Sequence, residues 1–270
     1  MDPFADHQIS DGSRKLYIAN LRRLNGGEEF KNLNFLKTTA DVEAQLEKYA
    51  PNTRRTYLIS IVSALKTKKG FEKVRDHYYG LMMSANGELK VQNVKSEKFK
   101  ENEMPQADIE AKQAELAAKP VSADLVLLSL YTLLPPRRAL DYAQLKWGAG
   151  DGPDSSNYFD GKKMYMNRYK TQGSYGQQVI DVPPALQKIL KAWRKKNNTD
   201  YVLVGPKGLK MTSTAVSKGL ARILGKKLGV SAIRSIYLTN KYGDKMKEMA
   251  ADAKAMGTST GTIEANYLKE

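Results

Sequence analysis

Residues 134–141 read Leu-Pro-Pro-Arg-Arg-Ala-Leu-Asp, and this stretch decides how the second half of the chain is interpreted. The run 122–134 is nearly all apolar and predicts a core helix, which the two prolines end. Arg138 then stands at the start of an amphipathic segment over 139–147, three residues before Asp141. This spacing lets the carboxylate hold the guanidinium across one helical turn, so Asp141 is expected to be a structural partner of Arg138.

Helical periodicity continues outward from this stretch in both directions. Helices are predicted over 10–24, 39–49, 51–65, 71–85, 88–100, 106–118, 185–195, 212–228, 231–242 and 244–256, with a last short helix carrying Tyr267. Two of the expected breaks lie at Asn86-Gly87 and at Gly243. Strand patterns are confined to 163–169, 177–182 and 201–204.

These elements predict a mainly α protein with one small antiparallel β-sheet. Because a residue before proline disfavours helix, Met104-Pro105 marks the expected domain boundary. The first domain would then be helical and cover 1–104, and the second would cover 105–270 and hold the sheet.

Composition excludes several classes of chemistry. The 270 residues include no cysteine and two histidines, which argues against disulfide frameworks, thiolate catalysis, zinc fingers and Ser-His-Asp hydrolysis. No apolar run approaches the roughly 20 residues that span a bilayer, and the start Met1-Asp2-Pro3-Phe4 lacks a signal-peptide pattern. An intracellular protein with no membrane partner is expected.

Charge points to a polyanionic partner. Lysine and arginine number 44 against 29 acidic residues, a net charge of +15, and phosphate neutralisation by such an excess releases counterions. We therefore expect a nucleic acid as the partner. The candidate DNA-contacting residues are Arg14, Lys15, Arg54, Arg55, Lys210, Lys218 and Arg222.

Four stretches of the second half follow one another in a distinctive order. They are 134–141 with Arg138, 169–173 with Lys170, 231–235 with Arg234, and Met256-Gly257-Thr258, nine residues before Tyr267. The order and the final spacing resemble the tyrosine recombinase (phage integrase) family, over nearly the whole chain. The helix that carries Arg234 looks most similar to recombinases of large DNA viruses and related mobile elements.

The resemblance implies a fold and an activity. The fold would be a two-domain DNA clamp, in which a helical core-binding domain precedes the catalytic domain, and the active form a homo-oligomer with a tetrameric synapse. The activity would be site-specific cleavage and rejoining of DNA through a 3′-phosphotyrosyl intermediate, without a metal or another cofactor. The protein would be associated with DNA inside the cell.

The roles implied for the residues agree with their chemistry. A phenol has an ordinary pKa of about 10, so Tyr267 needs cationic neighbours to attack as phenolate. Arg138 and Arg234 can neutralise the phosphorane-like transition state, and Lys170 can protonate the leaving 5′ oxygen.

The match departs from the family at its histidines. Ser231, Ser235 and Thr258 stand at those positions, and a hydroxyl cannot shuttle protons at neutral pH. Losing such a group costs on the order of 10²–10⁴ in rate, so a slow enzyme is expected, with Ser231 and Thr258 as hydrogen-bond donors to phosphate. The alternatives are a type IB topoisomerase-like or hairpin-end-resolving enzyme, and a DNA-binding relative with weakened catalysis.

Overall fold

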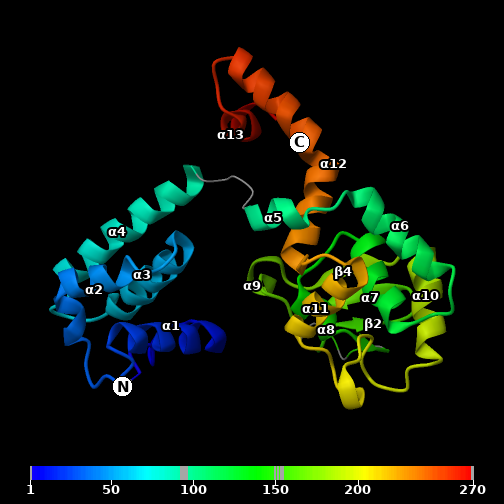
Figure 1. Ribbon diagram of the computed structural model, residues 1–270, viewed down its shortest axis with the longest axis horizontal. Helices are drawn as coiled ribbons and strands as arrows, with labels where there is room; N and C mark the ends of the chain where they lie inside the picture. Colours follow the sequence, from blue (N-terminus) through cyan, green and yellow to red (C-terminus); the bar gives the residue numbers. More distant parts are fainter. Residues whose placement is uncertain (1, 92–96, 149, 151, 153–154, 269–270) are drawn as a thin grey trace. The chain divides into compact units, whose positions relative to one another are not determined.

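The computed structural model describes residues 2–91, 97–148, 150, 152 and 155–268, and the chain forms two compact units (Figure 1). The first unit is Met1–Val94 and the second is Lys95–Glu270, each with its own apolar core. Among the described helices, none combines the length and the apolar character needed to cross a bilayer.

All of the secondary-structure elements in the described part of the first unit are helices. Its elements are α1 (Asp11–Leu24), η1 (Asn34–Lys37), α2 (Thr39–Leu46), α3 (Pro51–Leu65) and α4 (Glu72–Val91). Ser10 caps α1, because its hydroxyl accepts a hydrogen bond from the Ser13 amide at 3.2 Å. Helices α3 and α4 pack along each other, and the fully buried Tyr78 of α4 donates its hydroxyl to the Leu36 carbonyl at 2.9 Å.

The predicted break at Asn86-Gly87 is wrong, because α4 runs through both residues. Glycine lowers helix stability by only about 1 kcal/mol, which packing along α3 offsets. The helix predicted over 88–100 is therefore divided between the end of α4 and α5 (Glu97–Asn102), and its residues 92–96 lie outside the described part of the chain.

The second unit is built around α7 (Ala123–Thr132), which has seven consecutive buried residues, 125–131. Ser122 caps this helix with its hydroxyl, as the polar residue before an apolar run predicts. Three helices pack around it: α6 (Gln106–Ala117), α10 (Pro184–Arg194) and α11 (Ser213–Leu224). The shorter elements are α8 (Ala139–Ala143), α9 (Gln172–Tyr175), η2 (Pro206–Gly208), α13 (Thr260–Thr262) and η3 (Ile263–Tyr267).

The sheet has four strands in the order β1-β2-β3-β4. They are β1 (Lys146–Trp147), β2 (Tyr158–Phe159), β3 (Lys163–Met166) and β4 (Gln178–Asp181). β3 pairs antiparallel with both neighbours, with Met164 opposite Ile180 in the longer ladder.

The expectation of a purely antiparallel sheet is wrong, because β1 runs parallel to β2. Lys146 and Trp147 continue the amphipathic pattern of the preceding segment, which hid this two-residue strand inside a predicted helix. Residues 201–204 form only isolated bridges, Lys146 with Tyr201 and Val204 with Lys210.

The last long helix, α12 (Val230–Ala255), is continuous, so the predicted break at Gly243 is also wrong. Gly257 follows its last residues with φ of +66°, in the left-handed conformation that glycine adopts after helix ends. The amide of Gly257 bonds the Lys254 carbonyl, and that of Thr258 bonds Ala253, which completes a Schellman motif. Figure 1 shows the second half of α12 extending away from the rest of this unit, with α13 at its far end.

Candidate functional site

Three of the predicted catalytic residues, Arg138, Ser231 and Arg234, line one surface hollow. Arg138 is the N-cap of α8, whereas Ser231 and Arg234 belong to the first two turns of α12. The side of the hollow formed by α11 carries the hydroxyl residues Ser213, Thr214 and Ser217. The hollow therefore combines two guanidinium groups with several hydroxyls, a set suited to a phosphate group.

The sequence reasoning missed the α11 hydroxyls. Ser213 and Ser217 are four residues apart, a spacing that places them on one face of a helix. That spacing was the available signal, but it does not say which neighbour the face meets.

Arg234 is anchored by the proline pair. Its Nε donates to the Pro136 carbonyl at 3.1 Å, so the backbone that ends α7 and leads to Arg138 also fixes the second arginine. Within the described residues, neither the terminal nitrogens of Arg234 nor the Arg138 guanidinium donates a hydrogen bond. Both groups are therefore available to an incoming anion.

The side chain of Arg137, unlike that of Arg138, is held by partners within the protein. Its Nε donates to Asp141 Oδ2 at 3.1 Å, its Nη1 donates to Gln178 Oε1 at 2.7 Å, and its guanidinium lies 5.0 Å from the centre of the Tyr169 ring. The expected pairing of Asp141 with Arg138 is thus replaced by a pairing with Arg137. Arg138 has extended N-cap geometry, and it is the Arg138 carbonyl that accepts a hydrogen bond from the Asp141 amide.

Asp141 is a buried acidic residue that pairs with Arg137. Burial raises the pKa of its carboxyl, and the charge and hydrogen bond of Arg137 oppose that shift. Oδ1 of Asp141 and the hydroxyls of Tyr131 and Tyr142 are buried without a hydrogen-bond partner among the described residues. Burial also raises the pKa of both tyrosines, so they are neutral at physiological pH.

Lys170 lies on an exposed turn after β3. Its neighbours Tyr169 and Thr171 line a second hollow together with Arg138 and Arg234. The Lys170 side chain itself is not among the lining residues.

The structure does not bring Thr258 and Tyr267 to the arginines. The 21 residues of α12 that follow Arg234 span about 30 Å at 1.5 Å per residue, and Thr258 comes after the end of the helix. Tyr267 ends the π-helical turn η3 beyond it, and its side chain is 63% exposed.

The predicted DNA-contacting residues fall into two groups. Four arginines have internal partners: Arg14 bonds Asp2 and the Phe4 carbonyl, Arg54 bonds Glu88, Arg55 bonds Asn86, and Arg222 forms a bidentate pair with Asp124. Three lysines, Lys15, Lys210 and Lys218, are exposed.

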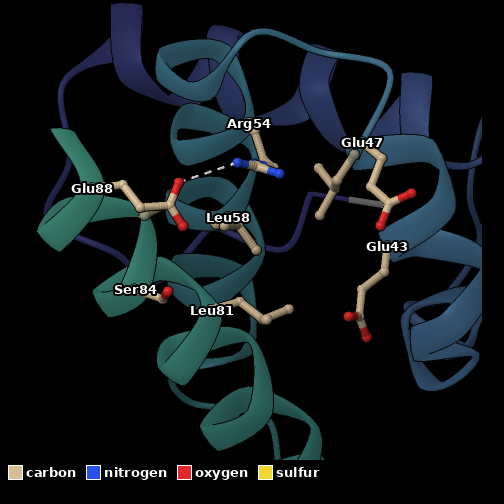
Figure 2. Close-up of a pocket in the computed structure, with 9 residues that line it drawn as sticks. Glu43, Glu47, Arg54, Leu58, Leu81, Ser84 and Glu88 are labelled. Carbon is tan, nitrogen blue, oxygen red and sulfur yellow. Dashed lines mark hydrogen bonds and ion pairs between the residues drawn. The ribbon is translucent and has the colours of Figure 1, made fainter. Parts of the chain in front are cut away.

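The surroundings of Arg54 are acidic, as Figure 2 shows. A small pocket of the first unit has the apolar residues Leu46, Leu58, Leu81 and Ala85 in its lining together with three glutamates. Glu88 lies 3.4 Å from the Arg54 guanidinium, while Glu43 bonds His77 at 2.8 Å. Three carboxylates beside one arginine do not favour a phosphate here.

In the part of the chain that the structure describes, no group of three or more His, Cys, Asp or Glu residues is arranged to hold a metal ion.

Comparison with known proteins gives a relationship at the level of the fold. No protein-family profile and no curated protein matches the sequence. Solved structures do match: the crystal structure of a lambda integrase dimer bound to a COC′ core site is similar with a TM-score of 0.57 and 12% identity, over 90% of this chain and 85% of that one. The crystal structure of XerA recombinase matches with a TM-score of 0.38 and 10% identity, over 90% of this chain and 81% of that one. The chain thus has the fold of a lambda integrase.

Proposed function

We propose that this protein is a DNA strand-transferase of the tyrosine recombinase type, which cleaves and rejoins DNA through a 3′-phosphotyrosyl intermediate. The observation that carries the proposal is the convergence of Arg138, Arg234 and Ser231 on one hollow, with both guanidinium groups available. Two arginines bind the non-bridging oxygens of a phosphodiester and offset the negative charge of its transition state.

Each remaining residue has a role in this scheme. Tyr267 is the nucleophile, Lys170 protonates the leaving 5′ oxygen, and Ser231 and Thr258 donate hydrogen bonds to the phosphate. Arg137 and Asp141 support the site from beneath. The protein would close on double-stranded DNA as a clamp of two domains, 1–104 and 105–270, and act as a homo-oligomer. The lambda integrase with the shared fold was crystallised as a dimer on DNA, which supports this reading.

The test is covalent trapping without added metal. The full chain is incubated with supercoiled plasmid, quenched in SDS and compared with Tyr267→Phe. A protein–DNA adduct that depends on Tyr267 is expected, while Tyr267→Phe still binds DNA in a mobility-shift assay. Arg234→Ala is expected to lose the adduct as well. An equal amount of adduct from Tyr267→Phe would refute the assignment.

A second function is favoured by one observation, the length of about 30 Å that α12 spans between Arg234 and its last residue, before the segment that carries Tyr267. A DNA-binding relative that has lost its chemistry would tolerate that separation. It would bind DNA tightly and with strong salt dependence, and would give no adduct even on nicked substrates.

A further inference from the structure

Asn157 is a fully buried polar residue, directly before β2, that connects two segments of the candidate site. Its side-chain nitrogen donates to the Asp141 carbonyl at 2.9 Å and to the Arg168 carbonyl at 3.0 Å. Its side-chain oxygen accepts from the backbone amides of Asn167 at 2.8 Å and of Arg168 at 2.7 Å. A side-chain amide has two donor and two acceptor positions, so every hydrogen-bonding position of Asn157 is used.

The two connected segments carry Arg138 and Lys170. Asp141 belongs to α8, the short helix whose N-cap is Arg138. Arg168 comes two residues before Lys170, at the start of the exposed turn. The four hydrogen bonds of Asn157 therefore join the helix that begins at one predicted catalytic residue to the turn that carries another.

The turn is also held on its other side. The Tyr169 hydroxyl donates to the Gly176 carbonyl at 2.7 Å, and the Gln172 amide donates to the Tyr169 carbonyl at 3.2 Å. The Tyr169 ring lies against the Arg137 guanidinium, at 5.0 Å from its centre. These contacts fix the backbone around Lys170, while the lysine side chain itself is exposed.

We infer that Asn157 is a positioning residue for proton transfer by Lys170, an assignment that rests on the proposed function. In that reaction the Tyr267 phenolate oxygen forms a bond to phosphorus, and the bond from phosphorus to the 5′ oxygen breaks with its electron pair on that oxygen. The 5′ oxygen takes one proton from the Lys170 ammonium, which becomes a neutral amine. Because the lysine stem is flexible, the place of the turn decides whether the ammonium reaches the oxygen while Arg138 binds the phosphate.

Two variants divide the connections that Asn157 makes. Asn157→Ala removes all four hydrogen bonds. Asn157→Asp has nearly the same size, and its carboxylate keeps an acceptor for the two amides but has no donor for the two carbonyls. The matched control is Asn197→Ala, since Asn197 is 4% exposed and bonds Thr199 and the Tyr201 carbonyl within one loop after α10. Each variant is studied at a temperature at which circular dichroism shows it to be folded.

Amide hydrogen exchange on the full chain, followed by mass spectrometry, tests whether Asn157 holds the turn. In both variants at 157, the peptide that covers 168–176 is expected to exchange about tenfold faster, because a buried group without its hydrogen bond opens more readily. Asn197→Ala should leave the exchange of this peptide unchanged. Equal exchange in the wild type and both variants at 157 would overturn the inference.

The rate of covalent cleavage tests the proton transfer, on a short duplex that contains the position at which the wild type cleaves plasmid DNA. Asn157→Ala and Lys170→Ala are expected to cleave it about 10²-fold more slowly. Both should regain most of the wild-type rate when sulfur replaces the leaving 5′ oxygen, because a thiolate leaves without taking a proton. Arg234→Ala should stay slow on both duplexes.

A cleavage defect of Asn157→Ala that the sulfur substitution does not restore contradicts positioning of the proton donor. If the wild type itself forms no adduct, the proposed function is refuted. The exchange measurement then still decides whether Asn157 holds the turn, because it does not depend on activity.

Discussion

At the scale of single residues, two adjacent arginines have divided structural and chemical roles. Arg137 is 16% exposed and bonded to Asp141, which is 2% exposed, whereas Arg138 leaves its guanidinium open to the hollow. Removing one partner of a buried ion pair leaves the other charge uncompensated. We therefore expect Arg137→Ala to lower the free energy of unfolding by about 3 kcal/mol, and Arg138→Ala by less than about 0.5 kcal/mol.

Urea unfolding followed by circular dichroism measures both values. A matched readout is binding of a short DNA duplex, which Arg138→Ala should weaken although its fold is intact. If Arg138→Ala is the more destabilised variant, the assignment of the two roles is reversed.

Asp141 gives a pH dependence whose sign follows from burial. Burial raises the pKa of this carboxyl, so the folded chain holds the proton at a pH where the unfolded chain has released it. The folded state then binds more protons, and stability falls as pH rises from about 4 through the raised pKa. Asp141→Asn cannot titrate and should flatten this part of the curve, as measured by the melting temperature at a series of pH values. An unchanged slope would mean that another group controls it.

The sequence did not allow a correct prediction of which arginine pairs with Asp141. Residues at i−3 and i−4 both reach a helical side chain, so Arg138 and Arg137 were both within range. The choice depends on Gln178 and Tyr169, which hold Arg137 from a distant strand and turn. Sequence spacing does not contain that information.

At the scale of elements, the caps and apolar runs were predictable, but the glycine positions were not. Ser10 and Ser122 cap the starts of their helices, and Gly257 follows the end of α12, as their residue types predict. Gly87 and Gly243 were expected to interrupt helices and do not. A glycine ends a helix only where the backbone enters the left-handed region, and neither of these residues does.

Gly243→Ala tests the continuity of α12 directly. A Cβ at this position would lie 3.6 Å from Thr239 Cγ2, an ordinary contact, and alanine favours a helix by about 0.5–1 kcal/mol over glycine. The variant should therefore be more stable by a similar amount, as shown by urea unfolding. A destabilised variant would indicate that α12 is broken at this residue.

At the scale of the whole molecule, the sequence indicated the mainly helical fold and the order of the site residues, but not their distances. Arg138, Ser231 and Arg234 line one hollow although they lie far apart in the sequence, because Arg234 Nε donates a hydrogen bond to the Pro136 carbonyl, two residues before Arg138. Tyr267 lies beyond a helix of 26 residues, so one wrongly placed break changes its position by tens of ångströms. An error at one residue of a long helix therefore displaces the predicted positions of the residues beyond it, whereas packing around α7 limits such displacements.

In the proposed function, the net charge of +15 makes the affinity for DNA depend on salt, and the partners of two α11 side chains allow a test of which charges contribute. Lys218 and Arg222 lie one turn apart on α11 and both are exposed, but Arg222 forms a bidentate pair with Asp124. A lysine that contacts phosphate adds about one unit to the slope of log affinity against log salt concentration. Lys218→Ala should reduce the slope by about one, and Arg222→Ala should leave it unchanged, as measured by fluorescence anisotropy with a labelled duplex across a salt series. Equal slopes for Lys218→Ala and wild type would remove this face of α11 from the DNA interface, and a reduced slope for Arg222→Ala would show that DNA displaces Asp124 from the guanidinium.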